Sequence, residues 1–265
     1  MACTPFSRCV GGALLLGAMS AAAPLASQTP PMVRLTRGMV ITRSVRIAPG
    51  RYRLPALTGD TALITIRGDS ITVEFTGAIL EGMPAGSDPD QAAGLAILID
   101  GGHGVTLKGA RIHGYQTAIR ATGTVDLTLL DNDLSDNWKP RLFSLVGHES
   151  LIDWLSFHHN ENGEWRRFGA GIALEGVHRG LLRGNTVRHG MNGLMLTRTD
   201  SLRIDRNDFS FNSGLGIGLY RATDNVIVRN RVDYNVRGYS HGYYRRGQDS
   251  ADLLMFEQSS RNVVA

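Results

Sequence analysis

The sequence predicts an all-β protein folded as a right-handed, single-stranded parallel β-helix, a solenoid whose coils repeat about every 22 or 23 residues. Asparagines recur at Asn185, Asn207 and Asn230, at spacings of 22 and 23, and an apolar residue stands two positions after each. Further columns repeat with the same period: Gly193 with Gly216, Leu196 with Leu219, and Asn212 with Asn235. The composition, with 32 Gly and only 20% charged residues, suits short strands and turns. Several columns that agree on one period indicate stacked repeats rather than separate domains.

The period continues towards the N-terminus. Leu107 matches Leu129 and Ile112 matches Leu134, each one period away, and Asn132 lies in the turn column opposite Ala110. Strand-like stretches at 62–66 and 70–75 indicate earlier, less regular coils, and residues 39–47 are expected to form a first strand or cap.

The residues of each repeat fit the physics of a parallel stack. Every strand bonds the coils above and below it, roughly 4.8 Å away, and alternate side chains point into a narrow core. Asparagine tolerates left-handed backbone at a turn, and its side-chain amides can bond along the axis in a ladder. A leucine-rich repeat would need a helical segment and a Leu-x-x-Leu-x-Leu frame in each unit, and neither is found.

Residues 1–28 have the character of a secretory signal peptide, which leaves 29–265 as the β-helix domain. Arg8 precedes an apolar run at 10–19, and small residues at 21–27 offer a cleavage site. The alternative is an uncleaved anchor, although the apolar run is short for a membrane span. Cys3 and Cys9 both lie in this leader, so the mature chain is expected to have no disulfide. We therefore expect a periplasmic or secreted protein with no membrane span once the leader is removed.

The stretch Leu-Arg-Ile-Asp-Arg-Asn-Asp-Phe-Ser-Phe-Asn at 202–212 resembles repeats of the pectate-lyase-like superfamily. More narrowly, residues 95–265 resemble the right-handed β-helix repeats of NosD-type periplasmic proteins and of carbohydrate-active enzymes. The resemblance implies the fold; the activities found on it include lyases, hydrolases, epimerases, esterases and non-catalytic adhesins. The copper binding that a NosD-type protein implies would need a Met/Cys/His cluster, which this sequence lacks.

Two insertions break the period, at 138–168 and at about 237–250. Both leave the coil after the same asparagine column and rejoin before the same strand, so both should emerge from one edge. They lie three rungs apart, roughly 14 Å at strand spacing. We expect them to meet and wall a cleft over the coils of Asn185 and Asn207, because insertions on one face of a solenoid commonly form its binding surface.

The first insertion holds all three tryptophans of the protein, surrounded by charged and histidine side chains. Aromatic rings can stack on apolar sugar faces while polar groups bond the hydroxyls. The alternative is that the tryptophans give this loop a small core of its own. The candidate sugar-binding residues are Trp138, Trp154, Trp165, His148, Glu149, Asp153, His158 and Arg166.

The second insertion is rich in groups that transfer protons. Its candidate catalytic residues are His241, Tyr243, Arg245, Arg246 and Asp249. They are similar to the Tyr/His/Asp centres of β-helix alginate epimerases and lyases, but the sequence departs from the Asp-Pro-His-Asp signature of the epimerases. The alternative is a polar loop that packs against the first insertion.

No metal site is established by the sequence. Residues 147–150 do not form a His-Glu-x-x-His zinc motif. Calcium is the one cofactor to consider, at Asp131, Asp133 and Asp136, where solvated turn aspartates are the alternative. The isolated histidines of the coils are expected to be structural. These are His103, His113, His178 and His189.

The expected function is to bind or process a polysaccharide or oligosaccharide, as a lyase, an epimerase or a glycoside hydrolase. The rival is a non-catalytic, NosD-like periplasmic binding or assembly protein. We expect a monomer with no nucleic-acid partner. Nearly all the basic residues are arginines, which fits either an anionic ligand or a compositional habit. Residues 262–265 match 225–228, the opening of a coil, so the chain is expected to be a fragment of a longer protein.

Overall fold

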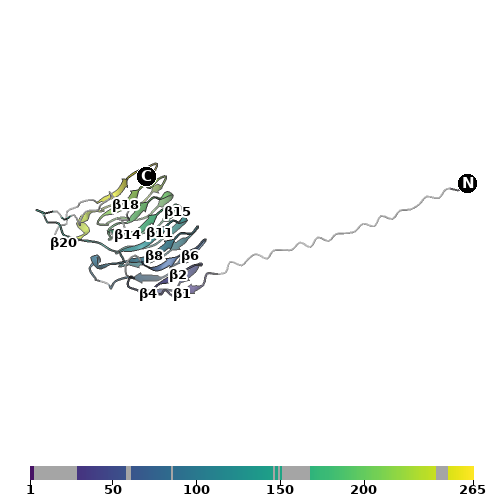
Figure 1. Cartoon of the computed structure of the whole chain (residues 1–265), viewed down its shortest axis with the longest axis horizontal. Helices are drawn as coiled ribbons and strands as arrows, with labels where there is room; N and C mark the ends of the chain where they lie inside the picture. Colours follow the sequence, from purple (N-terminus) through teal and green to yellow (C-terminus); the bar gives the residue numbers. More distant parts are fainter. Residues whose placement is uncertain are drawn as a thin grey trace.

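A computed structural model describes residues 1–2, 29–57, 61–84, 86–145, 147–148, 150, 168–242 and 250–265. The signal-peptide prediction falls almost wholly outside these residues. The described helices are two short 3₁₀ turns, η1 (Pro89–Gln91) and η5 (Arg237–Tyr239), and neither is long or apolar enough to cross a membrane. Strands form the rest of the regular structure, stacked from β1–β4 at one end to β18 and the C-terminus at the other (Figure 1).

Three parallel sheets run along the stack, and the chain passes from one sheet to the next around each coil. Sheet 1 contains, in spatial order, β1 (Met32–Val33), β3 (Val45–Ile47), β6 (Thr72–Glu74), β9 (Thr106–Lys108), β12 (Val125–Leu130), β15 (His178–Arg183), β17 (Asp200–Asp205), β19 (Val226–Val228) and β22 (Val263–Val264). Sheet 2 contains β2 (Met39–Ile41), β5 (Ala62–Ile66), β8 (Leu95–Asp100), β11 (Thr117–Thr122), β14 (Ala170–Glu175), β16 (Leu194–Thr197), β18 (Leu215–Tyr220) and β21 (Ala251–Phe256).

Sheet 3 is short. It contains β4 (Gly50–Arg53), β7 (Ala78–Glu81) and β10 (Arg111–His113). Beyond β10 it continues as single bridges from Arg111 through Asp133, Thr186 and Asp208 to Arg231. These bridges keep the third face in register even where no strand is formed.

The contacts between coils confirm the predicted period. Asn185 and Asn207, which are hydrogen-bonded to each other, stand 22 residues apart, and the next step along the same column is 23 residues. Asn132 bonds Asn185 across 53 residues, because the first insertion lies between them. Asn225 bonds Asn262 across 37 residues, because the second insertion lies between them. Subtraction of each insertion restores the ordinary step.

A narrow apolar core runs the length of the stack. Its side chains come from the inward positions of all three sheets, as Val73, Leu107, Leu129, Leu182 and Ile204 illustrate in sheet 1. Each of these is fully buried or nearly so. Burial of aliphatic side chains stabilises such a fold by roughly 1.5–3 kcal/mol per residue, so the core is a main source of stability for the described coils.

The predicted asparagine ladder is confirmed. The side-chain amide of Asn132 donates to Oδ1 of Asn185 at 2.7 Å, Asn185 donates to Asn207 at 2.8 Å, and Asn207 donates to Asn230 at 2.9 Å. The expectation that asparagine itself takes the left-handed backbone is wrong. The residue before it does, for example Arg206 with a φ of 56°. The asparagine keeps a negative φ and points inward, because its amide is needed along the axis.

The first coil is also more regular than expected. Residues 39–47 form two strands, β2 and β3, with a turn between them, and β4 completes a full coil. The turn is needed because the chain passes from sheet 2 to sheet 1 within this stretch.

Candidate functional site

Three long connections leave the solenoid at one edge, between sheet 3 and sheet 2. Two are the predicted insertions. The third is the connection 82–94 between β7 and β8, where the equivalent connection between β10 and β11 spans only 114–116. Its run of Pro, Gly, Ser and Asp at 84–89 was a sequence signal for a loop.

The connection 82–94 is fastened to the start of the first insertion. The indole Nε1 of Trp138 donates to the Asp90 carbonyl at 3.2 Å, and the Lys139 amide donates to the Pro89 carbonyl at 3.2 Å. Arg141 donates to the carboxylates of Asp88 and Asp90, both at 3.1 Å. The two segments therefore form one continuous wall.

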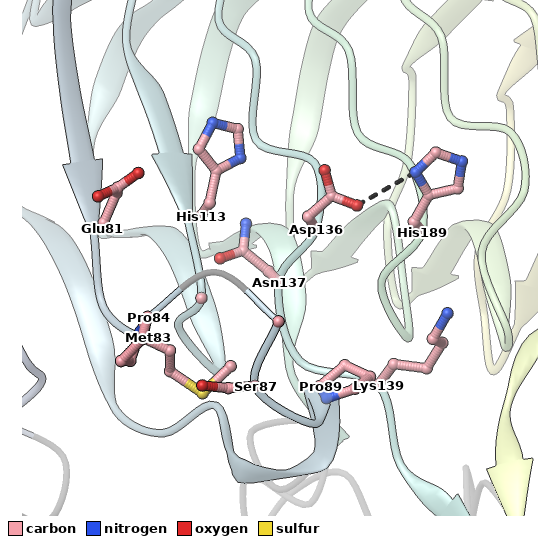
Figure 2. A pocket seen from close by; sticks show the side chains of 12 residues that line it. Glu81, Met83, Pro84, Ser87, Pro89, His113, Asp136, Asn137, Lys139 and His189 are labelled. Carbon is pink, nitrogen blue, oxygen red and sulfur yellow. Dashed lines mark hydrogen bonds and ion pairs between the residues drawn. The ribbon is translucent and has the colours of Figure 1, made fainter. Parts of the chain in front are cut away.

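Between this wall and the coil turns lies a cleft of about 430 Å³. Glu81, His113, Asp136 and His189 line one side, one from each of four successive coils, and Met83, Ser87 and Lys139 face them (Figure 2). The cleft thus collects two imidazoles, two carboxylates and an amine. This is the kind of concave, titratable site in which function is expected first.

Asp136 and His189 form a pair inside the cleft. His189 Nδ1 lies 3.2 Å from Oδ1 of Asp136, the contact dashed in Figure 2. The side chain of His189 is about half exposed and that of Asp136 more so. A carboxylate on Nδ1 fixes the ring and leaves Nε2 for another partner, which is how histidine is prepared as a general base.

The surroundings of Lys139 and His113 decide how these two cleft residues hold their protons. Burial lowers the pKa of Lys139, and the nearby Asp136 carboxylate partly opposes that shift. His113 Nδ1 lies 2.9 Å from the Ser135 carbonyl, so it carries the proton there and Nε2 faces outward as an acceptor. The site therefore holds an amine, that of Lys139, that loses its proton at a lower pH than an exposed lysine does.

The turn that carries Asp136 explains why these side chains face outward. Asp136, His189, Phe211 and Tyr234 occupy the same turn position on four successive coils, and all have left-handed backbone with φ between 55° and 61°. Gly114 fills this position one coil earlier, with a φ of 75°. A bulky residue in this conformation costs roughly 1–2 kcal/mol. The same conformation recurs at other turns, for example at Asp131 and Arg206, so it belongs to the repeat as a whole.

Beyond His189 the column becomes aromatic. Phe211 stacks on Tyr234 with ring centres 5.2 Å apart, and Tyr239 meets Phe211 edge-on at 5.9 Å. The Arg188 guanidinium lies over Phe211, 4.6 Å from its centre. Tyr234 is 60% exposed, so this stack presents a ring to solvent. We call Phe211, Tyr234 and Tyr239 the aromatic stack.

The two predicted insertions meet, as expected. β13 (Arg141–Leu142) in the first pairs in parallel with β20 (His241–Gly242) in the second. Leu142 and Ser240 are buried at this junction, as is Arg237 in η5. Most of the cleft predicted between the insertions lies outside the described residues, so that cleft stays a prediction.

Two predicted sugar-binding residues can be located. Trp138 is half buried and packs on a small apolar cluster outside sheet 2 that includes Phe168, Met191 and Met195. It therefore takes part in the base of the insertion, and its role in sugar binding stays a prediction. His148 is exposed in a bridge with Leu145.

Of the predicted catalytic residues, only the backbone of His241 is described, in β20. The remaining predicted site residues lie outside the described residues. These are Trp154, Trp165, Glu149, Asp153, His158, Arg166, Tyr243, Arg245, Arg246 and Asp249.

The interpretation of the coil histidines changes. His113 and His189, expected to be isolated structural residues, share the cleft with Asp136 and Lys139. The expectation overlooked that the step from Asp136 to His189 is one period once the first insertion is subtracted. His103 contacts Asp126 and His178 contacts Asp200 on another turn, as exposed histidine–aspartate pairs.

Within the described ranges, no three His, Cys, Asp or Glu side chains converge as metal ligands would. Two of the three turn aspartates have separate partners: Asp133 Oδ1 accepts the Ser135 amide, while Asp136 contacts His189. Calcium therefore finds no donor set among these three residues.

Comparison with known proteins gives one family. A family model described as a right-handed beta helix region matches residues 64–251, more than two thirds of the chain. No curated protein and no solved structure matches the chain. The stacked parallel sheets agree with the family match, and the chain belongs to the right-handed β-helix family.

Proposed function

We propose that this protein binds a polysaccharide in extended form along its loop-bearing edge and processes it at the Asp136–His189 pair. The observation that carries the proposal is one continuous row, in which an acid–base cleft is followed along the axis by exposed aromatic rings. From Glu81 to Tyr234 the row crosses six coils, which at about 4.8 Å per step is roughly 24 Å. A groove of this length accommodates a chain of several sugar units.

The aromatic stack supports a sugar ligand. A pyranose ring presents an apolar C–H face that packs on an aromatic ring, while its hydroxyls need polar partners. Tyr234 provides the exposed ring, and Arg188 and Arg231 flank Phe211 at 4.6 and 5.7 Å from the ring centre. Guanidiniums at this position can bond hydroxyls or the carboxylate of a uronate.

The cleft supports proton abstraction. In a uronate unit the ring carbon beside the carboxylate can lose its proton to Nε2 of His189, while Asp136 stabilises the imidazolium that forms. In a lyase the electron pair left behind forms a carbon–carbon double bond, and the glycosidic oxygen departs with a proton. In an epimerase the carbon takes a proton back on its opposite face. In either case the Lys139 ammonium can supply the proton.

The setting of this activity is also part of the proposal. The leader at 1–28 supports export to the periplasm or the medium, where polysaccharides are found. The rival function, non-catalytic binding or assembly in the manner of NosD-type proteins, shares the fold and differs in having no turnover.

The test combines glycan binding with turnover. The purified protein is screened on an array of neutral and uronate polysaccharides, and hits are followed by absorbance of the unsaturated product and by solvent deuterium uptake into the sugar. We expect a uronate polymer to bind and to react. Binding without product or deuterium uptake would favour the non-catalytic function, and no glycan binding at all would overturn the proposal.

Two variants locate the site. His189→Gly should abolish turnover and keep the fold, because glycine accepts the left-handed backbone at this turn. His178→Ala is the matched control, since it removes an exposed histidine–aspartate pair on a different turn. Tyr234→Ala should weaken binding by roughly 5–30-fold, the equivalent of about 1–2 kcal/mol of stacking, whereas the exposed Val40→Ala should not.

A further inference from the structure

Sheet 1 carries a cluster of charge that the edge cleft does not use. Asp205, at the end of β17, is fully buried, and four arginines surround its carboxylate. Arg229 donates to it through both Nε and a terminal nitrogen, at 2.8 and 2.7 Å. Arg183, Arg203 and Arg206 lie at 3.4, 3.8 and 3.9 Å. The cluster spans three successive coils.

The charges in this cluster do not balance. Burial alone raises the pKa of Asp205, but the hydrogen bonds and charge of Arg229, with the charges of Arg206 and Arg203, lower it overall. The carboxylate is thus ionised, and its two oxygens are occupied by the fork of Arg229. Arg183, Arg203 and Arg206 approach it without a hydrogen bond in the described structure, and each side chain is about half exposed.

Two other surface arginines are each matched by a carboxylate. Arg179 makes a two-bond fork with Asp126, and Arg261 makes one with Asp224. Each of these guanidiniums has a carboxylate of its own. The cluster around Asp205 instead has one carboxylate for four guanidiniums, which remain charged at any physiological pH.

Three guanidiniums with free donors favour a ligand with at least three acceptor oxygens. A carboxylate offers two oxygens and is matched by one fork, as Arg229 already shows. A sulfate or phosphate group offers three or four oxygens in a tetrahedral arrangement and bonds several arginines at once. It would also relieve the mutual repulsion of the guanidiniums.

We propose that Arg183, Arg203 and Arg206 form a binding site for a tetrahedral oxyanion, a sulfate or phosphate group, on the outer face of sheet 1. Asp205 and Arg229 are the support of this site, because the buried carboxylate holds the arginines together. The oxyanion is supplied either as a free ion or as an ester on a polymer. The site is independent of the edge cleft and of any reaction there.

The test is titration calorimetry of the purified protein with sodium sulfate, sodium phosphate and dextran sulfate, at constant ionic strength held with sodium chloride. We expect saturable binding at one site for at least one of the three. Binding of the inorganic ions identifies a free ion as sufficient, and binding of dextran sulfate alone identifies a polymer ester; both support the site. No binding of any probe overturns it.

Matched variants separate a built site from general positive charge. The double variant R203Q/R206Q should weaken binding at least tenfold, and the double variant R179Q/R261Q, which removes the same charge elsewhere, should leave it unchanged. Equal losses in both would show a diffuse charge effect and overturn the proposal. Thermal unfolding of both variants checks the fold, and unchanged glycan binding in R203Q/R206Q would show that the edge cleft is a separate site.

Discussion

Lys139 illustrates how burial and a neighbouring charge compete on one side chain. Burial in the cleft wall lowers its pKa below the usual 10.5, and Asp136 partly restores it. Because the folded-state pKa is lower than the unfolded one, the protonated amine disfavours the folded protein at neutral pH. That penalty begins to shrink as the pH rises through the folded-state pKa, and it is gone above the ordinary value of 10.5.

The chain offers a direct measurement of this shift, because Lys108 and Lys139 are its only lysines. In the variant K108R, Lys139 is the only side-chain amine, so its acetylation can be followed against pH by mass spectrometry. We expect the midpoint of reactivity below pH 10.5, and lower still in D136N, which lacks the opposing carboxylate. A midpoint at or above 10.5 would show that the amine is fully solvated.

At the scale of the element, the asparagine ladder joins neighbouring coils inside the turns. Asn207 accepts both the backbone and the side-chain amides of Asn185 and donates to the Leu182 carbonyl and to Asn230. Its side chain is almost fully buried, so water cannot replace these bonds. The ladder therefore fixes the register of successive coils as well as their spacing.

We expect N207A to lower the free energy of unfolding by about 3 kcal/mol, since it leaves two buried donors of Asn185 unsatisfied. Urea unfolding followed by circular dichroism gives the value. N230A is the graded control: Asn230 is only partly buried, so the same truncation should cost about half as much. Equal costs would mean that the ladder bonds are not what stabilises the turns.

We call the pairing of β13 with β20, which joins the two insertions, the strap. It depends on one glycine. Gly242 in β20 has a φ of 121°, and a Cβ placed there would lie 2.1 Å from the Leu142 carbonyl oxygen. G242V should therefore break the pairing of β13 with β20 and leave the coils intact. We expect proteolysis within 138–168 to become several-fold faster with little change in melting temperature.

The control for the strap is G147V. Gly147 also belongs to the first insertion, but a Cβ there meets nothing within 4 Å. It should keep the protease resistance of the parent protein. Resistance that is unchanged in G242V would show that the strap contributes nothing to holding the insertions together.

At the scale of the whole molecule, hydrogen-bonded carboxylates make the stability of the folded protein depend on pH. Hydrogen bonds from Thr76 and Lys108 lower the pKa of Glu74, and bonds from Arg179 and Arg261 lower those of Asp126 and Asp224. A depressed folded-state pKa adds stability that is present above the ordinary value and is lost as pH falls through the folded one.

We therefore expect the urea midpoint to hold at neutral pH and to fall modestly once the pH drops below the ordinary values of 4.5 for Glu74 and 3.8 for the aspartates, because exposed pairs contribute little each. D224N should flatten this fall, because it removes one of the titrating groups. A midpoint that does not change between neutral pH and pH 3 would exclude these pairs as a source of stability.

The sequence predicts the stack of coils well because many residues repeat with the same period. Asn207, Leu196 and Gly193 each repeat, and the insertions are what remains when the period is subtracted. The cleft lined by Glu81, His113, Asp136 and His189 was not predicted from the sequence. Glu81 and His113 share one column, and Asp136 and His189 share the next one. These positions align only once the extra residues of the connection 82–94 and of the first insertion are subtracted, and nothing local in the sequence marks them as neighbours.

The choice of site residues within the insertions was limited because it used the composition of each loop. The composition of the first insertion suggests a sugar platform. The indole Nε1 of Trp138 also fastens the connection 82–94, a contact that composition does not predict, and its role in sugar binding stays a prediction. Composition identifies which side chains a loop contains. It does not decide which of them the loop uses for its own attachment.

The equal pitch of the coils has a consequence for how this protein can change. A duplicated stretch of one full period, such as 185–206, would enter the stack in register and move every later coil outward by about 4.8 Å. The binding row would then gain a second copy of His189 and keep the aromatic stack at its far end. Tandem duplication would thus lengthen the groove in steps of one rung, and the number of sugar units bound would follow the number of coils.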